Sequence, residues 1–226
     1  MIPQTKVPSY TFRQCTLTML DDLFGVRQTF SSPVLDQWLT AGIDLRDIAL
    51  SEKERVSVND LQTLLAINIH VWNEHELLMY FIGPLFNLVR FTDPYRYNLF
   101  AQRKIGTVVD GVNEKIELSG EPDGIIATGF RAPEMPMFAF TEYTQGIETE
   151  SDPAGQTLAA MLVGQTLNDH NTPMYGAYAI GSVWYFMVLK GHEYMISRDY
   201  SALTDEVYDI LRIFKGLKQI VIQLTA

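Results

Sequence analysis

Two short apolar segments, 124–128 and 137–141, constrain the fold most, because each has an acidic residue at one end. The run GIIAT directly follows Asp123, and the run MFAFT directly precedes Glu142. The intervening loop 129–136 is rich in Gly and Pro. Short apolar runs bounded by such turn residues are typical of strands, so the two segments are expected to pair as antiparallel neighbours.

The expected pairing brings the two acidic residues together. If Thr128 lies opposite Met137, then Asp123 lies opposite Glu142, and directly opposed residues have Cβ atoms about 5 Å apart. Two carboxylates this close repel each other, so one must be protonated or a cation must lie between them. Carboxylate oxygens are suitable ligands for Mg²⁺ or Mn²⁺. The pattern therefore predicts a divalent-cation site at Asp123 and Glu142; the alternative is that both are solvated residues at strand ends.

The residues around this pair follow a recognisable order. They are Gly120-x-Pro122-Asp123, then Glu142-Tyr143-Thr144, then a helix opening with Asp152-Pro153-x-Gly155-Gln156, and a closing run with Tyr175-Gly176, Trp184-Tyr185-Phe186, Gly191-x-Glu193-Tyr194 and Ser197. This order resembles the PD-(D/E)XK nuclease superfamily, in a bacterial branch with an N-terminal helical segment. The resemblance implies a mixed-sheet α/β fold whose restriction-endonuclease-like core, of order αβββαβ, spans 73–226 and follows a helical extension at 1–72.

The resemblance also implies Mg²⁺- or Mn²⁺-dependent hydrolysis of phosphodiester bonds in nucleic acid, with DNA expected rather than RNA. Asp123 and Glu142 would hold the metal together with the backbone carbonyl of Tyr143, and relatives place a glutamine near Gln156 beside the active site. The third motif residue, a lysine in the family, is Thr144 here. Threonine supplies a hydroxyl but no positive charge for the phosphate. The resemblance therefore leaves two functions open: a nuclease of reduced activity, or an inactive nuclease fold that serves as a binding or assembly module.

A further acidic ligand is expected near the start of the core. Asn73-x-x-Glu76 is a capping signature, and the apolar helix that follows it contains Pro84, which predicts a kink. The resemblance places an acidic residue at this helix start near the metal, and Glu76 and Glu74 are the candidates, with Glu76 assigned to the metal. The alternative is that Glu76 only caps the helix and that Glu74 only favours its positive end.

Three helices are expected in the extension. Thr16 or Thr18 would cap a helix that ends at Gly25, Ser32-Pro33 would begin one that stops at Gly42, and Ser51-x-x-Glu54 would open a longer third one. This region shows no chemistry, so we assign it to packing or to the interface of a homodimer.

A cation that replaces the missing lysine is expected from the segment before the acidic pair. The pattern from Arg96 to Asp110 is that of a strand, and Asp110-Gly111 signals a hairpin. A two-residue turn there would set Asn98 opposite Asp123, with Arg96 diagonal on the same face. Further along the chain we expect a helix from 153, strands between 174 and 200, and a helix over 203–224.

Charge and composition limit the classes of function. The formal net charge of the 226 residues is −10. Since Lys and Arg supply most of the affinity for phosphates, an acidic chain is not expected to bind DNA tightly and without discrimination. No apolar run reaches the length of a membrane span, the N-terminus lacks the pattern of a signal peptide, and there is a single cysteine, Cys15. Cytoplasm is the expected location, with no membrane partner.

Overall fold

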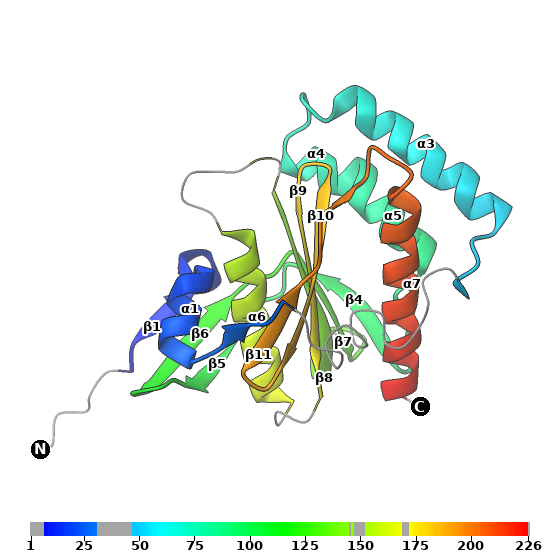
Figure 1. The fold of residues 1–226 in the computed structure, drawn as a ribbon. Coiled ribbons are helices and arrows are strands. Elements are labelled where there is room, and N and C mark those ends of the chain that lie inside the picture. Colours follow the sequence, from blue (N-terminus) through cyan, green and yellow to red (C-terminus); the bar gives the residue numbers. More distant parts are fainter. Residues whose placement is uncertain (1–6, 31–46, 145, 147–151, 169–171, 226) are drawn as a thin grey trace, which may run out of the picture.

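The structure, a computed structural model, describes residues 7–30, 47–144, 146, 152–168 and 172–225. It has a mixed α/β architecture, as predicted, with two sheets and helices between and around them (Figure 1). The predicted helix from Ser32 to Gly42 lies outside the described residues. Among the described helices, none is both long and apolar enough to cross a lipid bilayer.

The larger sheet has nine strands among the described residues, eight of which form one path of neighbours. In that path the order is β2 (Arg27–Gln28), β11 (Glu193–Ile196), β10 (Val183–Lys190), β9 (Met174–Ile180), β8 (Glu134–Thr144), β7 (Gly124–Thr128), β4 (Tyr97–Ala101) and β3 (Thr92–Asp93), and β12 (Tyr200–Ser201) pairs with β10. Strands β8 and β9 are parallel and are connected through α6 (Pro153–Leu167), whereas β4, β7 and β8 pair antiparallel.

The smaller sheet has the order β1 (Ser9–Thr11), β6 (Lys115–Gly120) and β5 (Ile105–Asp110). Helix α6 packs between the two sheets, and α1 (Leu17–Phe24) packs against it (Figure 1). On the other face of the larger sheet lie α5 (Gly83–Val89) and α7 (Val207–Leu224), and α3 (Glu52–Asn68) packs across both. The chain thus forms two apolar cores, one on each face of the larger sheet.

Most helix ends form where the capping residues predict them. Thr16 accepts a hydrogen bond from the Met19 N–H at the start of α1, and Gly25 ends that helix with a positive φ of 65°. Ser51 and Asn73 both form capping boxes, at the starts of α3 and of α4 (Glu74–Leu77). These side chains satisfy N–H groups that have no partner within the helix, which explains why the boundaries could be predicted locally.

Pro84 has a different effect from the predicted kink in a continuous α-helix. Residues Leu78–Ile82, labelled η3, form a π-helical stretch directly before α5, and the Gly83 N–H bonds to the Leu78 carbonyl five residues back. Proline then occupies the first turn of α5, where a missing N–H is tolerated. The wider π turn therefore accommodates the proline between two short helices.

The strand predicted from Arg96 to Asp110 is divided between the two sheets. Strand β4 belongs to the larger sheet, and β5 pairs with β6 in the smaller one through a loop at 111–114, which is longer than the predicted two-residue turn. As a result Asn98 lies opposite Ala127, and the prediction that it opposes Asp123 is wrong. The physical reason is that β6 pairs with β1 and β5 and never continues into the ladder of β7.

The region 1–72 is not purely helical. Besides α1 and α3 and a short 3₁₀ turn, η1 (Phe12–Gln14), it contributes β1 to the smaller sheet and β2 to the edge of the larger one. The division of the chain at residue 72 stays a prediction. What the structure adds is that the N-terminal strands pair with strands from much later in the sequence.

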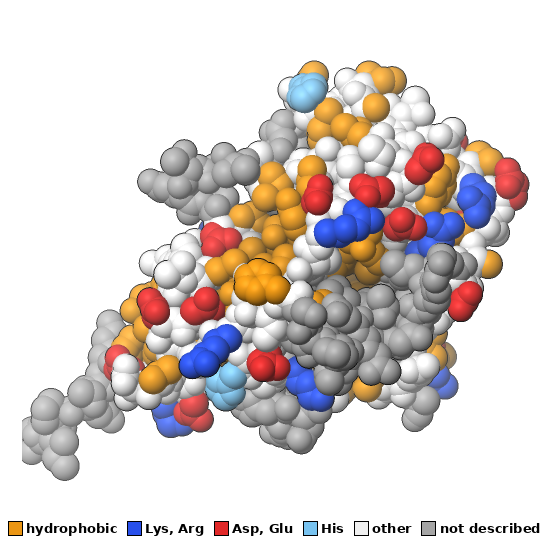
Figure 2. Space-filling model, viewed as in Figure 1, with side chains coloured by type: hydrophobic (Ala, Val, Ile, Leu, Met, Phe, Trp, Pro, Cys, Tyr) orange, Lys and Arg blue, Asp and Glu red, His pale blue; other side chains and the backbone are white. Residues whose placement is uncertain are grey.

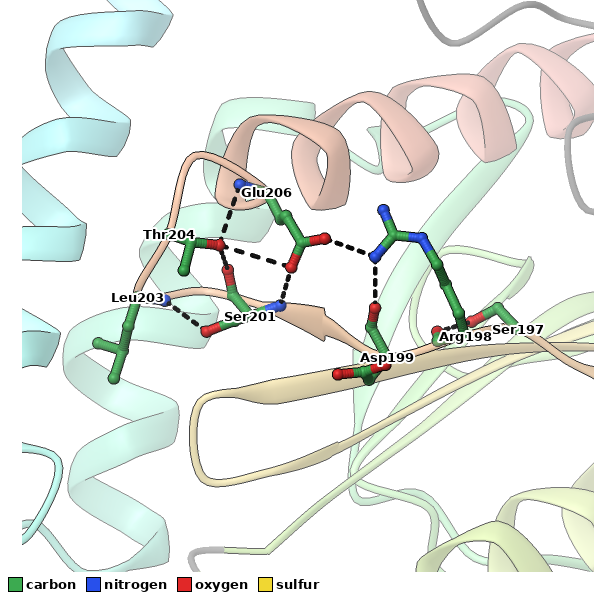
Figure 3. A network of polar contacts seen from close by, with 7 residues as sticks. All are labelled: Ser197, Arg198, Asp199, Ser201, Leu203, Thr204 and Glu206. Carbon is green, nitrogen blue, oxygen red and sulfur yellow. Dashed lines mark hydrogen bonds and ion pairs between the residues drawn. The ribbon is translucent and has the colours of Figure 1, made fainter.

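The last helix begins at Val207, four residues later than predicted, because a polar network occupies the preceding turn (Figure 3). The Glu206 carboxylate accepts hydrogen bonds from the Ser201 N–H and from the Arg198 guanidinium. The same guanidinium lies 3.9 Å from the centre of the Tyr200 ring. Arg198 is therefore engaged in holding β12 against the start of α7.

Candidate functional site

Asp123 and Glu142 lie next to each other on one face of the larger sheet. Gly124 pairs with Thr141, so one further step of the same register sets Asp123 beside Glu142, and the Tyr143 N–H donates to the Asp123 carboxylate at 2.9 Å. Ile125 and Phe140, two residues further along each strand, pack in the core on the α6 side. Since side chains alternate along strands, both carboxylates belong to that same face.

The register at the other end of this hairpin differs from the prediction. Two irregularities lie between Ile126 and Thr128, so that Ala127 pairs with Met137 and Thr128 pairs with Glu134. The predicted pairing of Thr128 with Met137 is therefore wrong. Bulges near the loop add residues to β8 only, and they leave the register at the acidic end unchanged.

Both carboxyl groups are held in surroundings that disfavour their negative charge. Glu142 is only 9% exposed, and burial together with the neighbouring Asp123 raises its pKa well above the ordinary value. Burial also raises the pKa of Asp123, although hydrogen bonds from the Tyr143 N–H and the Gln102 side chain act in the opposite direction. Neighbouring acids whose charged forms are disfavoured in this way are a common sign of a functional site.

The acidic pair opens into a cavity of about 810 Å³ between the larger sheet, the start of α6 and the smaller sheet. Its lining includes all four residues predicted to be catalytic, which are Asp123, Glu142, Thr144 and Gln156. A second cavity of about 310 Å³, lined partly by Asn73 and His75, also reaches Asp123. Asp123 thus lines both cavities.

The two basic residues of this cavity are ones that the sequence reasoning missed. Arg13 comes from η1, and Lys104 comes from the connection between β4 and β5. Arg96, the predicted substitute for the lysine, instead lines a separate groove with Tyr95 and Phe130. Local patterns do not reveal Arg13, because it reaches the cavity through the parallel pairing of β1 with β6, more than a hundred residues away in the chain.

Gln102 takes the position beside Asp123 that was expected for Asn98. Its backbone N–H donates to the Asp123 carbonyl at 3.3 Å, and its side chain acts to lower the pKa of the Asp123 carboxyl. Its φ is 48°, in the left-handed region that non-glycine residues rarely adopt. Strained backbone of this kind is concentrated at functional sites, and here it accompanies the contact with Asp123.

Of the two glutamates proposed at the start of the core, the structure brings Glu74 to the site. Glu74 lines both cavities, and its charge contributes to the raised pKa of Glu142. The Glu76 carboxylate instead accepts a hydrogen bond from the Asn73 N–H at 2.8 Å as part of the capping box. Glu76 therefore has the capping role that was weighed as its alternative, and the structure does not place it with Asp123 and Glu142.

Asp152 connects the N-terminal segment to α6. One carboxylate oxygen accepts from the Gly155 N–H at 3.0 Å and caps α6, and the other accepts from the Leu17 N–H at 2.9 Å at the start of α1. A Cβ on Gly155 would come within 2.5 Å of the Cys15 carbonyl, so the close approach of these two segments requires glycine. Asp152 thereby fixes the position of Arg13 relative to Gln156.

We expect Asp152→Ala to lower the free energy of unfolding by about 1–2 kcal/mol, because two helix N-termini lose a capping acceptor. Urea titration followed by circular dichroism measures this loss. Asp152→Asn is the matched control, since asparagine caps α6 but offers only one oxygen, and it should lose less. Equal stability of the alanine variant and the unchanged protein would contradict the assigned role.

The donor set is compatible with magnesium rather than with a fully protein-ligated metal. In the parts of the chain that the structure describes, no three His, Cys, Asp or Glu side chains are close enough to form a metal-holding group. Mg²⁺ usually keeps several waters and binds through one or two carboxylates. Two neighbouring carboxylates on one face, which repel each other without a cation, fit that mode of binding. No family model matches the sequence, and a search among curated proteins finds no match.

Proposed function

We propose that this chain is a metal-dependent phosphodiester hydrolase of PD-(D/E)XK type, with a restriction-endonuclease-like core. The observation that carries the proposal is the placement of Asp123 and Glu142 side by side on one sheet face at the wall of a cavity, with Asp123 half-buried and Glu142 buried. The same cavity holds Thr144 and Gln156 at the positions that the family pattern assigns to its active site.

The order of elements supports the proposed core. Helix α5, strands β4, β7 and β8, helix α6 and strand β9 follow one another as αβββαβ, and the four strands are neighbours in the larger sheet. The hairpin of β5 and β6 is an insertion between the first and second of these strands. It belongs to the smaller sheet, which forms the opposite wall of the cavity.

Each residue of the site has a separate task in this proposal. Asp123 and Glu142 would hold Mg²⁺ or Mn²⁺, which when bound lowers the pKa of a water ligand and neutralises the scissile phosphate. Gln156 lies in the first turn of α6, where its amide can orient a polar group in the cavity. Thr144 contributes no charge, and its hydroxyl donates to the Gly146 carbonyl at 2.9 Å.

The expected substrate is a polynucleotide, DNA rather than RNA, that is bound weakly. On the face shown in Figure 2, basic and acidic side chains are interspersed and form no continuous basic field. Near the site, Arg13 and Lys104 stand against four acidic residues, which are Glu74, Glu121, Asp123 and Glu142. Each phosphate that a protein cation neutralises makes the binding affinity depend more steeply on salt concentration. We expect few phosphate contacts here, so the affinity should fall only slightly as the salt concentration rises.

The proposal is tested by incubating the purified protein with labelled single- and double-stranded DNA and RNA, with Mn²⁺, with Mg²⁺ or with EDTA. We expect slow cleavage that needs the metal and that is lost in Asp123→Ala. Glu76→Ala is the matched control, since that carboxylate caps α4 outside the cavity, and it should retain activity. Cleavage that persists in EDTA or in Asp123→Ala would overturn the proposal.

The position of Thr144 favours a second candidate, a nuclease fold that has lost catalysis and serves as a binding or assembly module. In that case the protein would cleave no polynucleotide under any of these conditions. The Thr144→Lys variant then distinguishes two explanations for the inactivity. Cleavage gained by this variant would show an intact site that lacks only the lysine, whereas continued inactivity without Mn²⁺ binding in calorimetry would support the binding module.

A further inference from the structure

Arg13 reaches the acidic site from the opposite wall of the cavity. It lies in η1, between β1 and α1, and its side chain lines the cavity together with Asp123, Glu142 and Thr144. Arg13 is an exposed residue, and no ion pair joins it to another side chain in the described part of the chain. A positive charge is thus available in the cavity where the family pattern lacks one.

The two basic residues of the cavity are not equivalent. Arg13 comes from η1, whose backbone packs between β6 and α6, whereas Lys104 comes from the connection between β4 and β5. Lys104 also lines the cavity, where it can contact a bound chain.

The backbone around Arg13 is fixed at both ends. Before it, Ser9, Tyr10 and Thr11 pair in parallel with Glu117, Leu118 and Ser119 of β6. After it, the Leu17 N–H bonds to Asp152 at the start of α6. Buried Phe12 and Cys15 flank it in the core. A cation on such an anchored turn is held in place before substrate binds, which is the condition for effective electrostatic stabilisation.

We propose that Arg13, from the N-terminal segment, supplies the positive charge that the motif lysine supplies in this type of site, so that Thr144 is compensated by a residue distant in sequence. This inference rests on the proposed hydrolysis. In that reaction the oxygen of a water molecule bonds to phosphorus and the bond to one ester oxygen breaks. One proton of the water ends on the leaving oxygen and the other on the phosphate product. Arg13 stabilises the negative charge that the phosphate oxygens carry during this exchange.

The test measures kcat and KM for Mn²⁺-dependent cleavage of a labelled oligonucleotide. We expect Arg13→Ala to lower kcat about 100-fold with little change in KM, since the charge acts in the transition state. The kcat of Arg13→Lys should stay within about 10-fold of that of the unchanged protein, because lysine keeps the charge but lacks the planar guanidinium. Lys53→Ala, the matched control, removes an exposed cation of α3 that is not part of the cavity lining, and it should leave kcat and KM unchanged.

The decisive variant combines Arg13→Ala with Thr144→Lys. If Arg13 supplies the missing charge, the double variant should have a kcat at least about 10-fold higher than that of Arg13→Ala. Thr144→Lys alone should change the kcat of the otherwise unchanged protein little. A merely structural role for Arg13 would lower stability and would not be rescued by a lysine on β8.

Failure of this inference differs from failure of the proposed function. Two results would overturn the role of Arg13 without contradicting the proposed nuclease function. One is full cleavage activity of Arg13→Ala, and the other is a loss of cleavage in that variant that Thr144→Lys does not restore. An unchanged protein that is inactive but gains cleavage through Thr144→Lys would show that Arg13 does not compensate. Inactivity of every variant would overturn both.

Discussion

Glu142→Gln should abolish Mn²⁺ binding and polynucleotide cleavage, and at neutral pH it should also make the metal-free protein more stable. The amide keeps the shape of the side chain but removes an ionisable group whose charged form is disfavoured by burial and by the neighbouring Asp123. We expect at least a 1000-fold loss of cleavage, on the order of the loss when a group that acts directly in the reaction is removed. The free energy of unfolding should rise by about 1 kcal/mol, because active-site groups are often held at the expense of stability.

The stability of the metal-free protein should depend on pH in a direction set by Glu142. Its pKa is raised in the folded state above the ordinary 4.5, so the folded protein retains a proton that the unfolded chain releases. Stability from this group is therefore fully present below that ordinary value and is lost as the pH rises through the raised pKa. Thermal unfolding from about pH 5 to about pH 8 measures the decline, which Glu142→Gln should flatten and Mn²⁺ should oppose.

Glu206→Gln provides a control for the loss of a negative charge elsewhere, since that carboxylate is held by Arg198 and Ser201 far from the cavity. It should leave Mn²⁺ binding unchanged. A Glu142→Gln protein that binds Mn²⁺ as well as the unchanged chain does would contradict the assigned metal site.

Trp184→Ala should lower the free energy of unfolding by about 3–5 kcal/mol, the largest stability effect that we expect from a single change. Trp184 is fully buried and packs edge-on against Phe86 and Phe214. Its ring centre also lies 5.7 Å from that of Tyr143, the residue after Glu142. Removing it opens a cavity behind the strand that carries the site, so metal affinity should fall as well.

Urea titration measures this effect, with Tyr95→Ala as the control. The Tyr95 side chain is 96% exposed, so its loss should change the free energy of unfolding by less than about 0.5 kcal/mol. A loss below about 1 kcal/mol for Trp184→Ala would show that the aromatic cluster is not the core on which β8 rests.

The central pair of the site could be predicted from the sequence because its geometry is local. Asp123 and Glu142 belong to neighbouring strands joined by one loop, and alternation along each strand fixes their common face. The cap at Asp152 and the position of Gln156 follow from similarly short patterns. The capping box at Asn73 could be predicted equally well, and it explains why Glu76 is held away from the acidic pair, whereas Glu74 lines the cavity.

The residues that complete the cavity depend on pairings that no local pattern specifies. Gln102 lies beside Asp123 because β4 pairs directly with β7, whereas the hairpin between them in sequence joins another sheet. Arg13 arrives through the pairing of β1 with β6. Long-range pairing of this kind depends on which apolar faces meet in the complete fold, and a prediction that follows neighbouring segments misses it.

The most direct test of the metal site is a crystal structure with Mn²⁺ and its anomalous scattering. We expect one anomalous peak between the side chains of Asp123 and Glu142, about 2.1 Å from a carboxylate oxygen of each. The peak should be absent in crystals of Glu142→Gln. Crystals at saturating Mn²⁺ with no peak there, or with the two carboxylates on opposite faces of the sheet, would contradict the proposed site.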